Sequence, residues 1–86
     1  MKLYRIWQDE NKGYDIYDSA VVAAETPEQA RGIHPREIYD FYPRPWDGTE
    51  EPYGSWCVIE KVQVEEIGDA VDGTKAGVIL ASFNAG

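Results

Sequence analysis

A strand that leads directly into a capped helix is the feature that most constrains the fold of this chain. Residues 18–24 are small or β-branched, which is typical of a strand that packs flat in a sheet. The next segment, residues 26–29, has the sequence Thr-Pro-Glu-Gln. Its threonine can accept a hydrogen bond from the third helical amide, its glutamine can reach back to the cap amide, and proline suits the first helical position. Gly32 and Pro35 then predict the end of the helix after about two turns.

The remaining pattern predicts an α+β domain with a small, mainly antiparallel sheet. We expect the order β-β-α-long loop-β-β, with one short helix on one side of the sheet and all of residues 1–86 in a single domain. Turn-forming residues separate the predicted strands at 9–13 and 68–77. The other strands are predicted at residues 2–8, 58–67 and 78–83, with a short turn possible at 56–60.

An aromatic, proline-rich stretch occupies the middle of the chain, at about residues 36–55. Its prolines and glycines exclude a long regular element. Its aromatic content is too high for a disordered linker. We therefore predict a loop that packs onto the domain or binds something.

The predicted sheet carries more apolar surface than one short helix can cover. Alternation along the first strand places Leu3 and Trp7 on one face. Tyr4 and Ile6 lie on the other. The last strand is also apolar on both faces, with Val78 and Leu80 opposed to Ile79, Ala81 and Phe83. Either the 36–55 loop or another subunit must cover the second face, and we expect a homo-oligomer.

Composition narrows the function further. The 86 residues carry a net charge of -8, with one cysteine and one histidine. An internal disulfide and a Cys/His metal site are therefore not expected, and we predict no cofactor. The charge disfavours binding to duplex nucleic acid, and no apolar run is long enough to cross a membrane. Because the first residues lack the apolar core of a signal peptide, we expect a cytoplasmic protein.

Residues 31–46 form the strongest candidate for ligand contact, because they are locally basic in an acidic chain. Guanidinium groups bind phosphates through paired bonds, and aromatic rings stack on bases. The alternative is a packed loop in which arginine stems lie on the rings. The predicted ligand-binding residues are Arg31, His34, Arg36, Tyr39, Tyr42, Arg44 and Trp46.

Individual residues in and near this stretch have structural alternatives. His34 is expected to settle against the last carbonyls of the helix rather than to act as a base. Trp46 and Tyr53, flanked by proline and glycine, are expected to be exposed. Trp7, Trp56 and Cys57 are expected to pack in the core.

Several stretches at both ends of the chain share one resemblance. They are Gly13-Tyr14-Asp15, residues 17–25, Ala30-Arg31, His34-Pro35 and the terminal Ala81-Ser82-Phe83-Asn84-Ala85-Gly86. In these stretches the chain resembles a group of small, uncharacterised open reading frames of bacteriophages and other mobile elements. The resemblance covers about two thirds of the chain and excludes the 36–55 stretch. It implies no activity and no functional residue. It implies a context, an accessory protein of a mobile element in a bacterial host, and such proteins often inhibit host defence.

These observations lead to a non-enzymatic binding protein, with no catalytic residue assigned. The first hypothesis is a phage-type protein that sequesters a small nucleotide-like signal between subunits and so counteracts host immunity. The alternative is an acidic protein–protein inhibitor, of anti-CRISPR or anti-restriction type, that blocks a nucleic-acid-binding or enzymatic host partner. That inhibitor would use the exposed aromatics and the glutamates Glu50, Glu51, Glu65 and Glu66. A structural accessory role and a hydrolase built on His34 with Asp40 or Glu37 are further alternatives.

Overall fold

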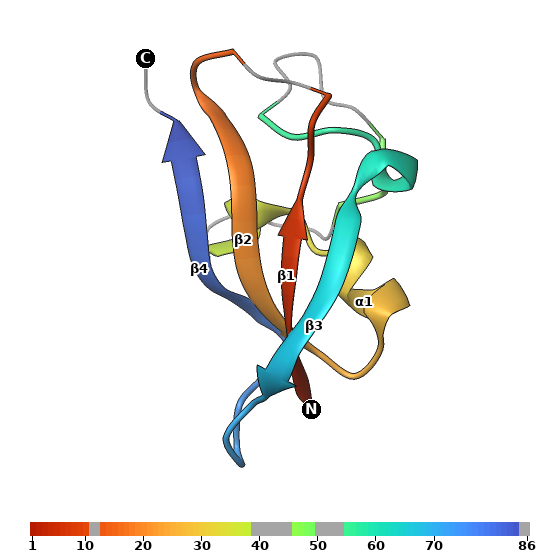
Figure 1. Ribbon diagram of the computed structural model, residues 1–86, viewed down its shortest axis with the longest axis vertical. Helices are drawn as coiled ribbons and strands as arrows, with labels where there is room; N and C mark the ends of the chain where they lie inside the picture. Colours follow the sequence, from red (N-terminus) through yellow and green to blue (C-terminus); the bar gives the residue numbers. More distant parts are fainter. Residues whose placement is uncertain (11–12, 39–45, 50–54, 85–86) are drawn as a thin grey trace.

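Four strands form one antiparallel sheet in the order β3-β1-β2-β4, and the α-helix and the first 3-10 helix lie on one side of it (Figure 1). The computed structural model describes residues 1–10, 13–38, 46–49 and 55–84. The strands are β1 (Lys2–Trp7), β2 (Ile16–Ala24), β3 (Gln63–Asp69) and β4 (Gly77–Asn84). The α-helix is α1 (Pro27–Arg31), and two 3-10 helices are η1 (Pro35–Ile38) and η2 (Ile59–Lys61). This confirms the predicted α+β fold with a four-stranded antiparallel sheet and one short α-helix.

The start of α1 is held by the two side chains that the sequence singled out. The Thr26 hydroxyl accepts a hydrogen bond from the Gln29 amide at 3.1 Å. The Gln29 side chain reaches back as predicted, but it accepts from the amide of Glu25 at 2.7 Å, one residue before the cap. The helix ends at Arg31, sooner than predicted, because the Gly32 amide already turns back to the Gln29 carbonyl at 3.1 Å.

Replacing Thr26 with alanine is expected to lower the free energy of unfolding by about 1 kcal/mol, because one helical amide loses its acceptor. Urea denaturation of Thr26→Ala beside Thr26→Ser measures this loss. The serine variant keeps the hydroxyl and should stay near the parent. Equal stability of the alanine variant and the parent would contradict the capping role.

The inner face of the sheet is shared between two short helices. α1 contacts β1, β2 and β3, while η1 contacts β2 and β4. Cross-strand register places Tyr4 beside Val22 and Ile6 beside Ala20, so these side chains project to the helix side. The core cluster also contains Tyr17, Ala24, Ala30, Ile33, Trp46, Trp56, Cys57 and Val62. Burial of Trp56 and Cys57 confirms the sequence prediction for both. The prediction that Trp7 also packs in the core is wrong, because Trp7 is half-buried and outside the core cluster.

A bulge near the start of β4 changes which of its residues share a face. Val21 pairs with Leu80 whereas Val22 pairs with Val78, so Ile79 is an extra residue in β4. Val78 and Ala81 consequently both pack against the core, and Leu80 points outward with 65% of its surface exposed. Strict alternation had placed Val78 and Leu80 on one face and Ala81 on the other, which is wrong because a bulge shifts the period by one residue.

The described part of the 36–55 stretch lies on the inner side of the sheet. Trp46 is buried in the core cluster, and the Gly48 carbonyl accepts a hydrogen bond from the Ile59 amide at 3.0 Å. The face of the sheet turned away from α1 and η1 is thus not covered by residues 46–49 (Figure 1). Within the described ranges, no helix has the length and apolar character needed to cross a bilayer.

Candidate functional site

The structure places the described members of the predicted ligand site in different surroundings. Arg31 is the exposed last residue of α1, whereas His34 and Trp46 are buried and Arg36 is half-buried in η1. His34 and Trp46 are brought together, with ring centroids 5.3 Å apart in an edge-to-face arrangement. The other three predicted residues, Tyr39, Tyr42 and Arg44, lie outside the described residues.

His34 is a core residue that organises the start of η1. Only 1% of it is exposed, and its Nδ1 accepts a hydrogen bond from the Arg36 amide at 3.0 Å. Burial, together with the nearby Arg36 charge, lowers the pKa of His34 to about 3. The imidazole is therefore neutral near pH 7, and Nδ1 acts as an acceptor for a turn rather than as a base. The expected contact with helix carbonyls is replaced by this bond to the chain that follows.

Trp46 anchors the segment from which it comes. Its ring N–H donates to the Thr49 carbonyl at 2.7 Å, and its amide donates to the Glu37 carboxylate at 3.2 Å. Only 8% of Trp46 is exposed, so the prediction of an exposed side chain is wrong. Its flanking prolines and glycine indicated a loop, but its ring N–H and its backbone amide each have an acceptor, and the ring packs against His34. Trp46 and His34 are placed to hold the fold together.

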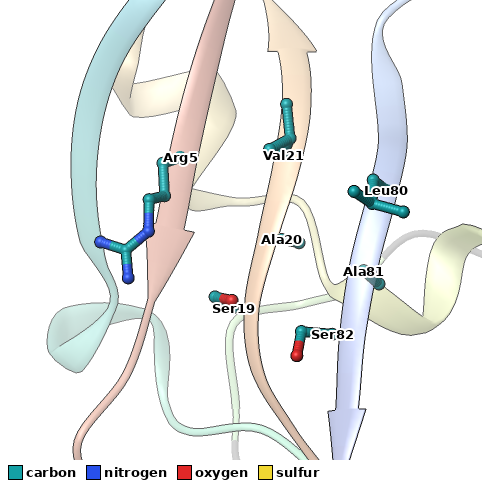
Figure 2. Close-up of a pocket in the computed structure, with 7 residues that line it drawn as sticks. All are labelled: Arg5, Ser19, Ala20, Val21, Leu80, Ala81 and Ser82. Carbon is teal, nitrogen blue, oxygen red and sulfur yellow. The ribbon is translucent and has the colours of Figure 1, made fainter.

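The other candidate site lies on the sheet face turned away from α1 and η1. No described residue of the 36–55 stretch covers this face, which is called the uncovered face below. Register places Arg5 beside Val21, and Val21 beside Leu80. A shallow hollow of about 260 Å³ lies here, and Figure 2 shows its lining residues on three neighbouring strands with the helices behind them. The lining residues are Arg5, Ser19, Ala20, Val21, Leu80, Ala81 and Ser82. The hollow has an apolar floor with two hydroxyls, which suits contact with a protein side chain better than a phosphate.

Arg5 and Trp7 form a stacked pair on this same face. The guanidinium carbon lies 4.4 Å from the Trp7 ring centroid, within the range of a cation–π contact. Figure 2 shows the Arg5 guanidinium turned toward β3 rather than toward β4. Glu65 of β3 is the cross-strand neighbour of Arg5. The half of the face over β1 and β3 therefore combines an aromatic ring, a cation and a carboxylate.

The two edges of the sheet differ in charge. β3 carries Glu65, Glu66 and Asp69, with Glu60 just before it in η2, and all four are exposed. Lys2 forms an ion pair with Asp69 at 2.6 Å, which raises the pKa of Lys2 and lowers that of Asp69. The other edge, β4, has no charged residue from Gly77 to Asn84.

Sequence reasoning found part of this second site and missed part. Alternation along the first strand correctly grouped Leu3 with Trp7 and apart from Tyr4. The same period of two places Arg5 between them on this face, so the position of Arg5 is predictable from the sequence. Leu80 was recognised as apolar, but its exposure depends on the bulge at Ile79, for which the sequence has no marker.

No family model, curated protein or solved structure matches this chain. Among the described residues, no three histidine, cysteine, aspartate or glutamate side chains gather in a way that could hold a metal ion.

Proposed function

We propose that this chain is a non-enzymatic, acidic binding protein that docks on a partner protein through the β1–β3 half of its uncovered sheet face. The observation that carries this proposal is the joint presence of the Arg5–Trp7 stack and the exposed carboxylate of Glu65, the cross-strand neighbour of Arg5, on the same face. Tryptophan and arginine dominate the energetic centres of protein interfaces. Carboxylates around such a centre favour a partner with a basic surface and speed its encounter.

The class of partner follows from charge. A protein with a net charge of -8 is attracted to basic grooves, which are found on nucleic-acid-binding proteins and on enzymes that act on nucleic acids. Together with the resemblance to mobile-element reading frames, this favours a host defence protein in the bacterial cytoplasm. The chain would act as an inhibitor by occupying the basic groove.

Two observations favour this function over sequestration of a nucleotide. Of the residues expected to hold such a ligand, His34 and Trp46 are buried and therefore cannot contact a ligand at the surface. Arg31 is exposed, but as the last residue of α1 it belongs to the helix side of the sheet and not to the hollow. Burial and neutrality of His34 also argue against the hydrolase alternative, since a base has to reach its substrate.

A charge reversal on β3 tests the docking surface. Immobilised chain is incubated with bacterial lysate, retained proteins are identified by mass spectrometry, and the dissociation constant of the purified partner is measured. Glu65→Lys is expected to weaken binding about tenfold or more, because it repels the basic partner and also faces Arg5. Asp72→Lys is the matched control, since it makes the same charge change in the exposed turn between β3 and β4 and should bind like the parent.

Two further measurements distinguish docking on a partner protein from sequestration of a nucleotide. Trp7→Ala should also reduce partner affinity about tenfold or more, as truncation of an interface centre does. Thermal denaturation in the presence of a panel of linear and cyclic nucleotides should give an unchanged melting temperature, because only a ligand of the folded state stabilises it. A clear rise with one nucleotide, or equal partner binding by Glu65→Lys and Asp72→Lys, would contradict the proposal.

A further inference from the structure

Among the residues that the structure describes, none pairs with the outer side of β4, which is therefore a strand edge. β4 lies at the end of the strand order, and on its inner side it pairs with β2. The Asn84 carbonyl accepts from the Asp15 amide, so the main chain of Asn84 faces β2. Because main-chain groups alternate sides along a strand, those of Phe83 and Ala81 face away from β2. Within the described part of the chain, no backbone group pairs with this outer side.

β4 also lacks most of the features by which edge strands avoid association. From Gly77 to Asn84 it contains no proline and no charged residue. Ile79, Leu80 and Phe83 are 49%, 65% and 48% exposed. The bulge at Ile79 lies near the start of the strand and leaves the following residues extended. The opposite edge, β3, is protected by three carboxylates within seven residues.

The distribution of charge identifies the occupant of this edge. Two copies of a chain with a net charge of -8 repel each other wherever their carboxylates meet. β4 is uncharged and lies across the sheet from acidic β3, about 14 Å away at three strand spacings. We propose that β4 pairs antiparallel with β4 of a second copy. The pairing joins two four-stranded sheets and places their acidic β3 edges at opposite ends.

Symmetry specifies the geometry of this pairing. A two-fold axis perpendicular to the sheet makes the contact self-complementary and keeps the uncovered faces of both copies on the same side. Leu80 and Ser82, which line the hollow in each copy, then approach their counterparts near the axis. The pairing does not depend on the proposed function, which uses the β3 side of the face.

Light scattering after size-exclusion chromatography tests the pairing with full-length protein. The parent is expected to have twice the 9.7 kDa mass of one chain at micromolar concentration. Leu80→Lys should raise the dissociation constant of the dimer about tenfold or more, since like charges then face each other across the axis. Val71→Lys is the matched control: it makes the same change at a residue that is 81% exposed in the β3–β4 turn, and it should remain dimeric. A monomeric parent, or a dimer that Leu80→Lys does not weaken, would overturn the proposal.

Disulfide trapping gives a second test that does not depend on weakening the strand. The sequence has one cysteine, Cys57, and it is buried, so an added cysteine is the only exposed thiol. Leu80→Cys, Ser82→Cys and their equimolar mixture are oxidised separately. Rapid cross-linking of one single variant places the axis at that residue, and cross-linking of only the mixture places it at Ala81. Failure of all three to cross-link faster than Val71→Cys would overturn β4 pairing.

Discussion

Lowering the pH from 6.5 toward 3 is expected to remove up to about 5 kcal/mol of folding free energy through His34 alone. In the folded chain, burial and the Arg36 charge lower the pKa of His34 to about 3, while the unfolded chain keeps a pKa near 6.5. Between these values the unfolded state takes up a proton and the folded state does not. Stability therefore increases with pH across this window at up to about 1.4 kcal/mol per unit, and it is lost as the pH falls.

The single histidine makes this prediction directly measurable. Proton NMR has the ring C–H signals of one imidazole to follow, and in the folded protein their chemical shifts should not titrate near pH 6.5. Urea denaturation from pH 4 to 7 then gives the slope of stability. A His34→Asn variant keeps an oxygen that can accept from the Arg36 amide but has no proton to gain, so its slope should be smaller.

The pH dependence of stability that comes from carboxylates is the same in the parent and in the His34→Asn variant, so it cancels in the comparison of their slopes. Asp47 and Asp69 have lowered pKa values from their bonds to Thr49 and Lys2, and both act in the parent and in the variant. A His34 signal that titrates near pH 6.5 in the folded state, or identical slopes in parent and variant, would contradict the buried, neutral histidine.

The predictable part of the fold is the part that local chemistry decides. The helix cap at Thr26 could be predicted because both of its partners, the Thr26 hydroxyl and the Gln29 amide, lie within three residues of each other in the sequence. The inner residues of β1 were readable because that strand has no inserted residue between Lys2 and Trp7 in its pairing with β2. The faces of β4 could not be predicted in this way, because its bulge is set by pairing with β2, a strand more than fifty residues earlier in the sequence. A residue pattern of period two cannot anticipate such a shift.

The candidate site shows the same division. Arginines and aromatic rings near each other in sequence suggested a pocket, yet their contacts are long-range. Trp46 is buried because Glu37 and Thr49 receive its two N–H groups and His34 meets its ring. The uncovered face became recognisable only when register brought Val21 and Leu80 together. Composition indicates which residues are capable of binding, but the sheet decides which of them remain accessible.

Gly48 is expected to be the position in the described 46–49 segment least tolerant of a methyl group. Its φ of +90° disfavours any residue with a Cβ, and a Cβ there would lie 3.1 Å from Ile59 Cγ2 and 3.3 Å from Ile59 Cβ. Gly48→Ala should lower the free energy of unfolding by about 2–4 kcal/mol, combining backbone strain with overpacking. The strained turn would also pull on the hydrogen bond from the Ile59 amide to the Gly48 carbonyl.

Gly73 provides the matched control, because it has nearly the same backbone conformation without the contact. Its φ is +88°, and a Cβ there would meet no heavy atom within 4 Å. Gly73→Ala should therefore cost only the backbone strain, about 1–2 kcal/mol, as measured by urea denaturation of both variants. The difference between the two losses reports the packing of residue 48 on Ile59, and thus the attachment of this segment to η2. Equal losses would mean that residue 48 does not pack on Ile59. That result would contradict the placement of residues 46–49, including Trp46, on the inner face of the sheet.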